Sequence, residues 1–102
     1  MDITTTDNQI ELNGRFDAHE VPGFTAAVEP LLEAGSGDLS VDLAKVEFID
    51  SSALAALVAT SKALAGSGRG FAIANPSDPV QVIFELTGLD KAFECVFTTA
   101  AS

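Results

Sequence analysis

The hydrophobic and polar positions of the first residues alternate in the way that is typical of strands. Residues 2–6 are rich in β-branched side chains, and residues 9–13 alternate polar and apolar, which is the period of a half-buried strand. The Asp-Asn pair at 7–8 favours a turn between them. These residues predict a hairpin, and we expect Gly14 to break the strand pattern before residues 15–17 lead into a loop.

Residues 18–34 carry apolar side chains at spacings of three and four, which predicts an amphipathic helix. Asp17 is expected to be its N-cap, with Glu20 at the capping-box spacing. Pro30 conflicts with this pattern, because a proline inside a helix removes a backbone hydrogen bond. We therefore expect Pro30 to kink the helix or to end it early, and the glycines at 35–37 to end it in any case.

A second strand-to-helix unit follows in the middle of the chain. Residues 39–43 alternate as a strand, and residues 46–49 are either its continuation or a short extended connection. From Ser52 to Leu64 the pattern is helical, with many alanines, which favours close packing against a sheet. The Gly-Ser-Gly run at 66–68 is expected to end this helix.

The last part of the chain predicts one more such unit. Residues 70–74 are nearly all apolar, as in a strand covered on at least one face. Asp78 is expected to cap a third helix, with Pro79 at its first position and Gly88 at its end. A final strand is expected over residues 93–97. The apolar positions of the third helix are Val80, Ile83, Phe84 and Leu86.

The resulting order is β-β-α-β-α-β-α-β, which is typical of an α/β fold with right-handed crossovers and a mixed or mainly parallel sheet. No linker is long enough to divide the 102 residues. We therefore expect a single domain over residues 1–102, large enough to form one core without disulfides or metal ions.

The net charge of the chain limits the kinds of molecule that it can bind. Fifteen Asp and Glu residues stand against five Lys and Arg residues, a net charge of −10. Because phosphate contacts require cations, we expect no nucleic-acid partner and no anionic membrane surface, whereas a basic protein is compatible. No apolar run approaches the length of a membrane span, so we expect no membrane insertion. The first ten residues lack the features of a signal peptide, which predicts a cytoplasmic setting.

The chain has one cysteine and one histidine, which limits its chemistry. Cys95 lies in an apolar run and is expected to be a small buried side chain. With His19 it cannot form a thiolate or imidazole metal cluster. Three scattered carboxylates, Asp17, Asp42 and Asp50, are too few to predict a cation site. We expect no metal and no cofactor.

No enzyme motif is present in the sequence. The G-x-S-x-G motif of serine hydrolases and the glycine-rich phosphate loops are missing. The Gly-Ser-Gly-Arg-Gly run at 66–70 follows a helix instead of opening one, so we interpret it as a helix end and turn. These observations predict a protein that is not an enzyme.

The candidate site is the Asp-Ser-Ser run at 50–52, where the middle strand meets the second helix. From the residues alone, two interpretations stay open. Asp50 or Ser51 can be a helix N-cap without further role. Alternatively, the serine pair can be a phosphorylation site, because a helix N-terminus tolerates the added charge. The modification would then act on a docked partner, by charge repulsion or by steric exclusion.

Three segments resemble the STAS domain family, in particular bacterial anti-sigma factor antagonists of the SpoIIAA type. Residues 42–54 are similar to the pattern D-L-x-x-V-x-F-[IM]-D-S-S-G-L, with Ala53 in place of the usual Gly. Residues 12–17 resemble L-x-G-x-[LF]-D, and residues 79–93 resemble P-x-V-x-x-[LIF]-[FL]-x-x-[ST]-G-L-x-x-x-F. The resemblance covers nearly the whole chain, with the segments in the order and spacing of the family.

This resemblance implies a small STAS-type domain with a four- to five-stranded mixed sheet and helices mainly on one face. It also implies partner switching. The unphosphorylated protein would bind an anti-sigma factor that is itself a serine kinase of the GHKL type, and so release the sigma factor. Phosphorylation by that kinase would end the binding, and a PP2C-type phosphatase would restore it.

Matched residue by residue, the phosphoacceptor of the family is Ser51, with Ser52 as the fallback acceptor. Asp17 matches a family position near the partner-binding surface, and Asp50, Ser51, Ser52 and Ala53 complete the expected set. Alanine is a better helix former than glycine by about 1 kcal/mol. Ala53 should therefore strengthen the start of the helix, while adding a methyl group beside the acceptor.

Two other hypotheses compete with this one. STAS domains also serve as structural subunits, for example on the ATPase of a lipid-transport ABC complex or on anion transporters, where no phosphate is needed. A nucleotide-binding or hydrolytic activity of the chain itself is the third hypothesis. The sequence offers no phosphate loop to support it.

Overall fold

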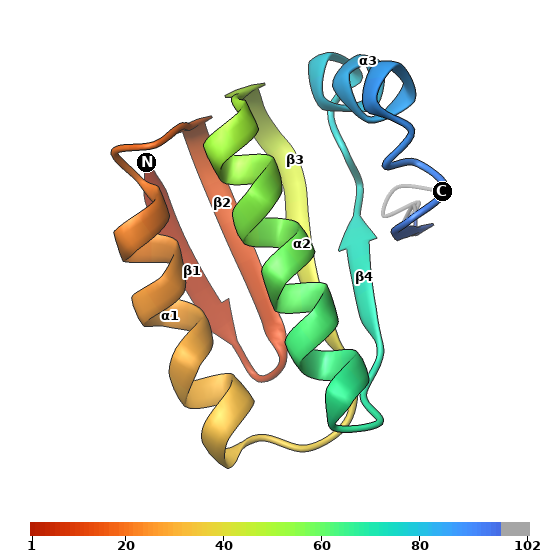
Figure 1. Ribbon diagram of the computed structural model, residues 1–102. Helices are drawn as coiled ribbons and strands as arrows, with labels where there is room; N and C mark the ends of the chain where they lie inside the picture. The colour runs from red at the N-terminus through yellow and green to blue at the C-terminus, as the bar shows by residue number, and fades with distance from the viewer. Residues whose placement is uncertain (97–102) are drawn as a thin grey trace, which may run out of the picture.

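Five strands and three helices alternate along residues 1–96, the part of the chain that the computed structural model describes. Their order is the one that the hydrophobic pattern predicts (Figure 1). The elements are β1 (Asp2–Thr6), β2 (Gln9–Phe16), α1 (Val21–Ala34), β3 (Leu39–Ile49), α2 (Ser51–Gly66), β4 (Phe71–Ala74), α3 (Asp78–Thr87) and β5 (Glu94–Val96).

The strands form one mixed sheet in the order β1-β2-β3-β4-β5. β1 and β2 are an antiparallel hairpin in which Thr6 pairs with Gln9 across the predicted turn. β2, β3, β4 and β5 are parallel neighbours, so their carboxyl ends lie at one edge of the sheet. This edge matters for function, because β2 and β3 both lead from it into the segments that contain the candidate site residues.

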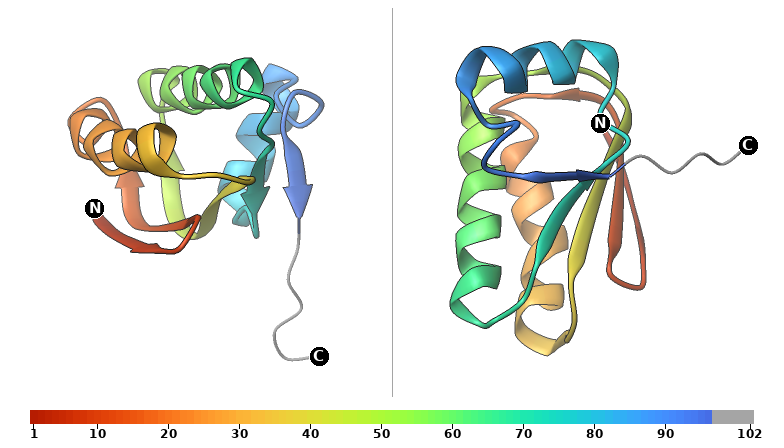
Figure 2. Two further views of the ribbon diagram at one scale, coloured as in Figure 1. Left: turned by 90° about the horizontal axis from the view of Figure 1, so that it is seen from below. Right: turned by 90° about the vertical axis from the view of Figure 1, so that its right-hand side faces the viewer.

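Helices α1 and α2 lie side by side on the same face of the sheet, as Figure 1 shows. Helix α3 lies across the end of the sheet and packs on β3 (Figure 2). The structure therefore confirms the expected α/β fold with helices mainly on one face. The other face of β2 is polar, since Gln9, Glu11 and Asn13 are exposed there.

The core lies between the sheet and the helices. Phe16, at the end of β2, packs against Phe24 of α1 with ring centroids 5.0 Å apart, and Phe93 contacts Phe84 at 5.6 Å. The contact between Phe16 and Phe24 anchors the loop between β2 and α1 at both of its ends. The largest fully buried side chains are Phe16, Phe24, Phe84, Ile10, Leu12, Leu39, Leu43, Leu57, Leu64, Ile73, Val41 and Val46.

The sequence predicted that Gly14 would end its strand, and this prediction is wrong. β2 continues through it to the buried Phe16. Gly14 has φ +116°, a conformation that favours glycine, and the register of β2 against β3 shifts between Gly14 and Arg15. The glycine thus marks an irregularity within a continuing strand, a common role for glycine in sheets.

Helix α1 differs from its prediction at both ends. It begins at Val21 instead of residue 18, and Glu20 occupies the N-cap position without a side-chain capping bond. Asp17 is not the N-cap, because its Oδ1 accepts a hydrogen bond from His19 N in the turn before the helix. The helix also continues through Pro30 to Ala34.

The continuity of α1 at Pro30 has a simple physical cause. A proline at this position leaves the carbonyl of Ala26, four residues earlier, without its helical donor. Both residues are exposed on the outer side of the helix, so water can reach the freed group. The helix therefore tolerates the proline without ending.

Two smaller differences concern α3, and one alternative that the sequence left open in β3 is decided. Residues 46–49 are the continuation of β3 and not a separate connection. Ser77, not Asp78, is the N-cap residue of α3, so that Asp78 is already helical. Leu86 was expected on the apolar side of α3, but it is 78% exposed. Residue 97, the last position of the strand expected over residues 93–97, and the burial of Cys95 lie outside what the structure describes.

The Gly-rich turn after α2 also holds the end of α1. Arg69 donates from Nε to the carbonyl of Gly37 (2.8 Å) and from Nη1 to that of Leu31 (3.0 Å). A second, longer bond from Nη1 reaches the carbonyl of Leu32 (3.4 Å). The turn is confirmed as a helix end, and its arginine supplies the positive charge that the last turn of α1 itself lacks.

Candidate functional site

Asp50 connects β3 to α2 and is the N-cap residue of that helix. Its backbone is extended (φ −105°, ψ −179°), and its carboxylate Oδ1 accepts a hydrogen bond from Ala53 N at 2.9 Å. Its carbonyl accepts from Leu54 N at 3.0 Å, the first helical bond of α2. The N-cap interpretation of the Asp-Ser-Ser run is therefore confirmed for Asp50.

The second carboxylate oxygen of Asp50 reaches a different part of the chain. Oδ2 accepts a hydrogen bond from Ala18 N at 3.0 Å, in the loop between β2 and α1. The backbone N–H of Asp50 also donates to the carbonyl of Phe16 at 3.2 Å, next to that loop. One acidic residue thus joins the start of α2 to the end of β2.

Asp17 lies in the loop that Asp50 holds. Its Oδ1 accepts from His19 N (3.0 Å), and its carbonyl accepts from Glu20 N (2.9 Å), which closes a tight turn. The Asp17 side chain is half-buried, whereas His19 is exposed. The structure therefore brings the loop that contains Asp17 next to residues 50–52.

Both serines are exposed at the first two positions of α2. The positive end of the helix dipole lies at these positions, and the first turn of α2 contains no acidic side chain. A hydroxyl in this place is accessible to a partner, and the helix dipole offsets part of the charge of a phosphate placed on it beside the Asp50 carboxylate. The two serines differ in their surroundings.

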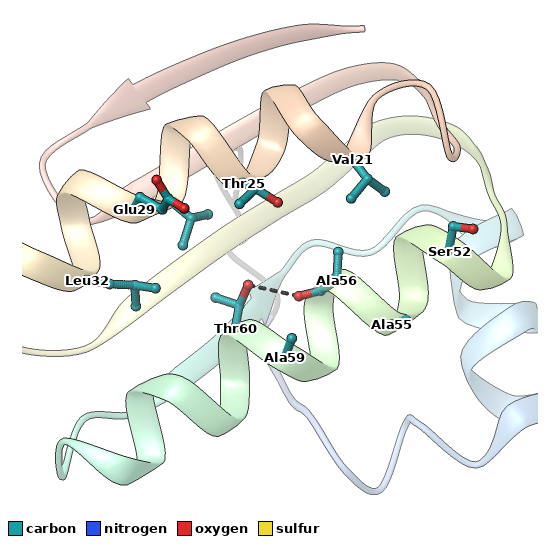
Figure 3. A pocket seen from close by; sticks show the side chains of 10 residues that line it. Val21, Thr25, Glu29, Leu32, Ser52, Ala55, Ala56, Ala59 and Thr60 are labelled. Carbon is teal, nitrogen blue, oxygen red and sulfur yellow. Dashed lines mark hydrogen bonds between the residues drawn. The ribbon is translucent and has the colours of Figure 1, made fainter.

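Ser52 lies at one end of a groove between α1 and α2, and Ser51 does not line it (Figure 3). The groove has a volume of about 420 Å³ and small side chains along its α2 wall. The Thr60 hydroxyl in this wall donates to the carbonyl of Ala56 at 2.9 Å, so it is already satisfied within the helix. The other lining residues are Val21, Thr25, Val28, Glu29, Leu32, Ala55 and Ala59.

Ala53 was expected to place a methyl group beside the acceptor serine at the partner-binding surface, but its side chain lies elsewhere. Its side chain is 0% exposed and belongs to the hydrophobic core. The methyl group that distinguishes it from the usual Gly thus faces the interior and not the surface beside Ser51. A direct contact between this side chain and a partner would require the core to open.

One exposed feature near the site was missed from the sequence. Phe48 is 39% exposed, and the guanidinium of Arg15 lies 4.2 Å from the centre of its ring. The two residues are paired in register on β2 and β3. The alternation of β2 could have predicted that Arg15 lies on the polar face. Its contact with Phe48 could not be predicted in this way, because it depends on the pairing of β2 with β3.

Residues 1–96 contain neither a cluster of metal-ligating side chains nor a helix of the membrane-spanning kind. No three His, Cys, Asp or Glu side chains there are grouped so that they could hold a metal ion. In the same residues, no helix combines the length and the apolar character that crossing a bilayer requires.

Comparison with known proteins places this geometry in a family. The profile described as "Mlab, STAS domain" matches residues 1–98. An anti-sigma-B factor antagonist from Staphylococcus aureus is 32% identical over 91 residues, which cover 87% of this chain and 84% of the relative. The name of this relative describes a regulatory protein and not an enzyme.

Solved structures agree with this assignment. An anti-sigma factor antagonist from Mycobacterium paratuberculosis superposes with a TM-score of 0.81 at 28% identity, over 96% of this chain and 85% of that one. The phosphorylated form of the Bacillus cell fate determinant SpoIIAA shares the fold (TM-score 0.73, 20% identity), over 96% of this chain and 90% of its own. The chain belongs to the STAS domain family.

Proposed function

We propose that this protein is a cytoplasmic anti-sigma factor antagonist that is switched by phosphorylation of Ser51. The observation that carries the proposal is the exposed Ser51 hydroxyl at the start of α2, beside the Asp17 loop that Asp50 holds. The names of the relatives support the antagonist role. They favour it over a structural subunit of a transporter.

In this proposal the unphosphorylated protein binds an anti-sigma factor that is also a serine kinase of the GHKL type. The expected contact surface comprises Asp17, Asp50, Ser51 and Ser52, with Ala53 contributing through the position of the helix. Binding occupies the anti-sigma factor, and the sigma factor is released.

Phosphorylation then ends the binding. The kinase transfers the γ-phosphoryl group of ATP to Ser51 Oγ: the new O–P bond forms, the bond to the ADP oxygen breaks, and the hydroxyl proton is lost. The product carries roughly −1.5 to −2 additional charges at neutral pH. A PP2C-type phosphatase restores the hydroxyl by transferring the phosphoryl group to water.

The local structure supports a switch that acts on the partner and leaves the fold intact. Ser51 is exposed, so the phosphate displaces no core side chain. The positive end of α2 favours the added charge. An anti-sigma factor docked over the same surface, by contrast, would meet both the charge and the bulk of the phosphate.

The test is to incubate the protein with the candidate anti-sigma kinase and ATP and to locate the phosphate by mass spectrometry. Ser51→Ala should abolish labelling. Ser52→Ala is the matched control and should leave labelling in place. Phosphate on Ser52 in the unaltered protein would refute the assignment to Ser51. Isolation of an ABC ATPase as the bound partner would instead support the transporter-subunit hypothesis.

A further inference from the structure

The two carboxylate oxygens of Asp50 serve two different elements. Oδ1 caps α2 through Ala53 N, and Oδ2 binds Ala18 N in the loop between β2 and α1. Capping a helix requires only one acceptor oxygen. The second hydrogen bond is therefore not explained by the capping role.

The second bond has a specific structural consequence. Ala18 and His19 are exposed, so side-chain packing restrains this part of the loop weakly. The turn that Asp17 closes with His19 and Glu20 fixes the local shape of the loop. The Phe16–Phe24 packing and the bond from Asp50 N to the Phe16 carbonyl hold the ends of the loop, and the link from Ala18 to the Asp50 carboxylate additionally joins residues 17–19 to the start of α2.

We propose that Asp50 is a positioning residue, which holds the loop at residues 17–19 beside Ser51 so that both form one preformed docking surface. This inference rests on the proposed function, because the surface it describes is the one that an anti-sigma factor would meet. A surface that is ordered before binding loses less conformational entropy when the partner docks. The link should therefore contribute to affinity without taking part in phosphoryl transfer.

Substitutions can separate capping from positioning. Asp50→Ser keeps a good N-cap oxygen, but this single oxygen cannot accept from both Ala53 N and Ala18 N. Asp50→Asn keeps the shape of the side chain, yet one end of its amide is now a donor and cannot accept from a backbone N–H. Asp50→Ala removes both functions and serves as the reference for complete loss.

The first measurement needs no partner. Amide hydrogen exchange should be faster at Ala18 in Asp50→Ser, while the amides of α2 retain their protection. In Asp50→Ala both regions should exchange faster. Unchanged protection of Ala18 in Asp50→Ser and Asp50→Asn would overturn the inference.

The second measurement uses the anti-sigma kinase. Asp50→Ser should weaken binding and raise the KM for phosphorylation roughly 2- to 10-fold, which is the effect of one lost hydrogen bond. A fall in kcat with an unchanged KM would instead place Asp50 in phosphoryl transfer and would contradict the positioning role. A general loss of folding would be visible as reduced protection throughout α2.

Different results would refute the proposed function and the positioning role of Asp50. If the unaltered protein neither binds the kinase nor is phosphorylated, the proposed function is wrong and the inference falls with it. If the unaltered protein binds and Asp50→Ser binds equally well, only the positioning role of Asp50 is refuted.

Discussion

At the scale of single residues, three neighbours at the start of α2 have three different environments. Ser51 is exposed and does not line the groove, Ser52 is exposed at the end of the groove, and Ala53 is buried in the core. A phosphate on Ser51 would therefore change the charge of the surface while the core under it stays as it is. This arrangement leads to two predictions.

The charge at Ser51 should control partner binding. Ser51→Asp should weaken binding to the anti-sigma factor at least about tenfold, since an unfavourable charge at an interface can cost several kcal/mol. Ser51→Asn, of nearly the same size but uncharged, is the matched control and should bind much better than Ser51→Asp. Isothermal titration calorimetry measures both. Equal affinities for the two variants would mean that bulk, and not charge, excludes the partner.

The methyl group of Ala53 should matter for stability and not for phosphorylation. Ala53→Gly removes a buried methyl group and a good helix former, so it should lower the free energy of unfolding by about 1–2 kcal/mol. Urea denaturation measures this change. The rate of Ser51 labelling should stay the same in conditions where the variant is folded; a several-fold change would show that the kinase senses this position.

At the scale of elements, the departures from the sequence-based predictions come from neighbours that are distant in the chain. Gly14 and Pro30 are local signals that an element ends. β2 nevertheless continues beyond Gly14, because it pairs with β3 there. α1 continues through Pro30, because the residues around the lost hydrogen bond are exposed to solvent. The end of α1 likewise depends on Arg69, which follows α2. Local residue preferences cannot anticipate such partners.

Arg69 should be important for the stability of the whole domain. Arg69→Met removes the charged donor from the carbonyls of Leu31 and Gly37, and should lower the free energy of unfolding by about 1–3 kcal/mol. Arg69→Lys should recover part of this loss through its remaining charge. Lys62→Met, on the exposed surface of α2, is the control and should change stability by less than about 0.5 kcal/mol. Equal unfolding midpoints for Arg69→Met and Lys62→Met would contradict the role of Arg69.

At the scale of the whole molecule, the net charge of −10 should guide association with a basic partner, whereas the groups of that partner that face Ser51 in the docked complex should be acidic. Long-range attraction between opposite charges raises the association rate and is screened by salt. We predict that the association rate constant with the anti-sigma factor falls as salt rises from about 0.05 to 0.5 M, with a smaller change in the dissociation rate. Stopped-flow kinetics provides both constants. An association rate that is independent of salt would exclude electrostatic steering.

The sequence predicted the order of the elements and the family, because hydrophobic periods and three motif segments persist along the chain. It could also predict that the Asp-Ser-Ser run at 50–52 begins a helix. It could not predict that the Asp50 carboxylate joins Ala18 to Ala53, since that contact depends on the pairing of β2 with β3. The burial of Ala53 likewise follows from how α2 lies on the sheet.

The affinity of the anti-sigma factor for the two forms of the unaltered protein, unphosphorylated and phosphorylated at Ser51, tests the central claim most directly. Calorimetry on both forms, with the site of the phosphate verified by mass spectrometry, provides the comparison. We predict tight binding of the unphosphorylated form and binding weaker by at least about tenfold after phosphorylation. Equal affinity of the two forms would contradict the phosphorylation switch at Ser51.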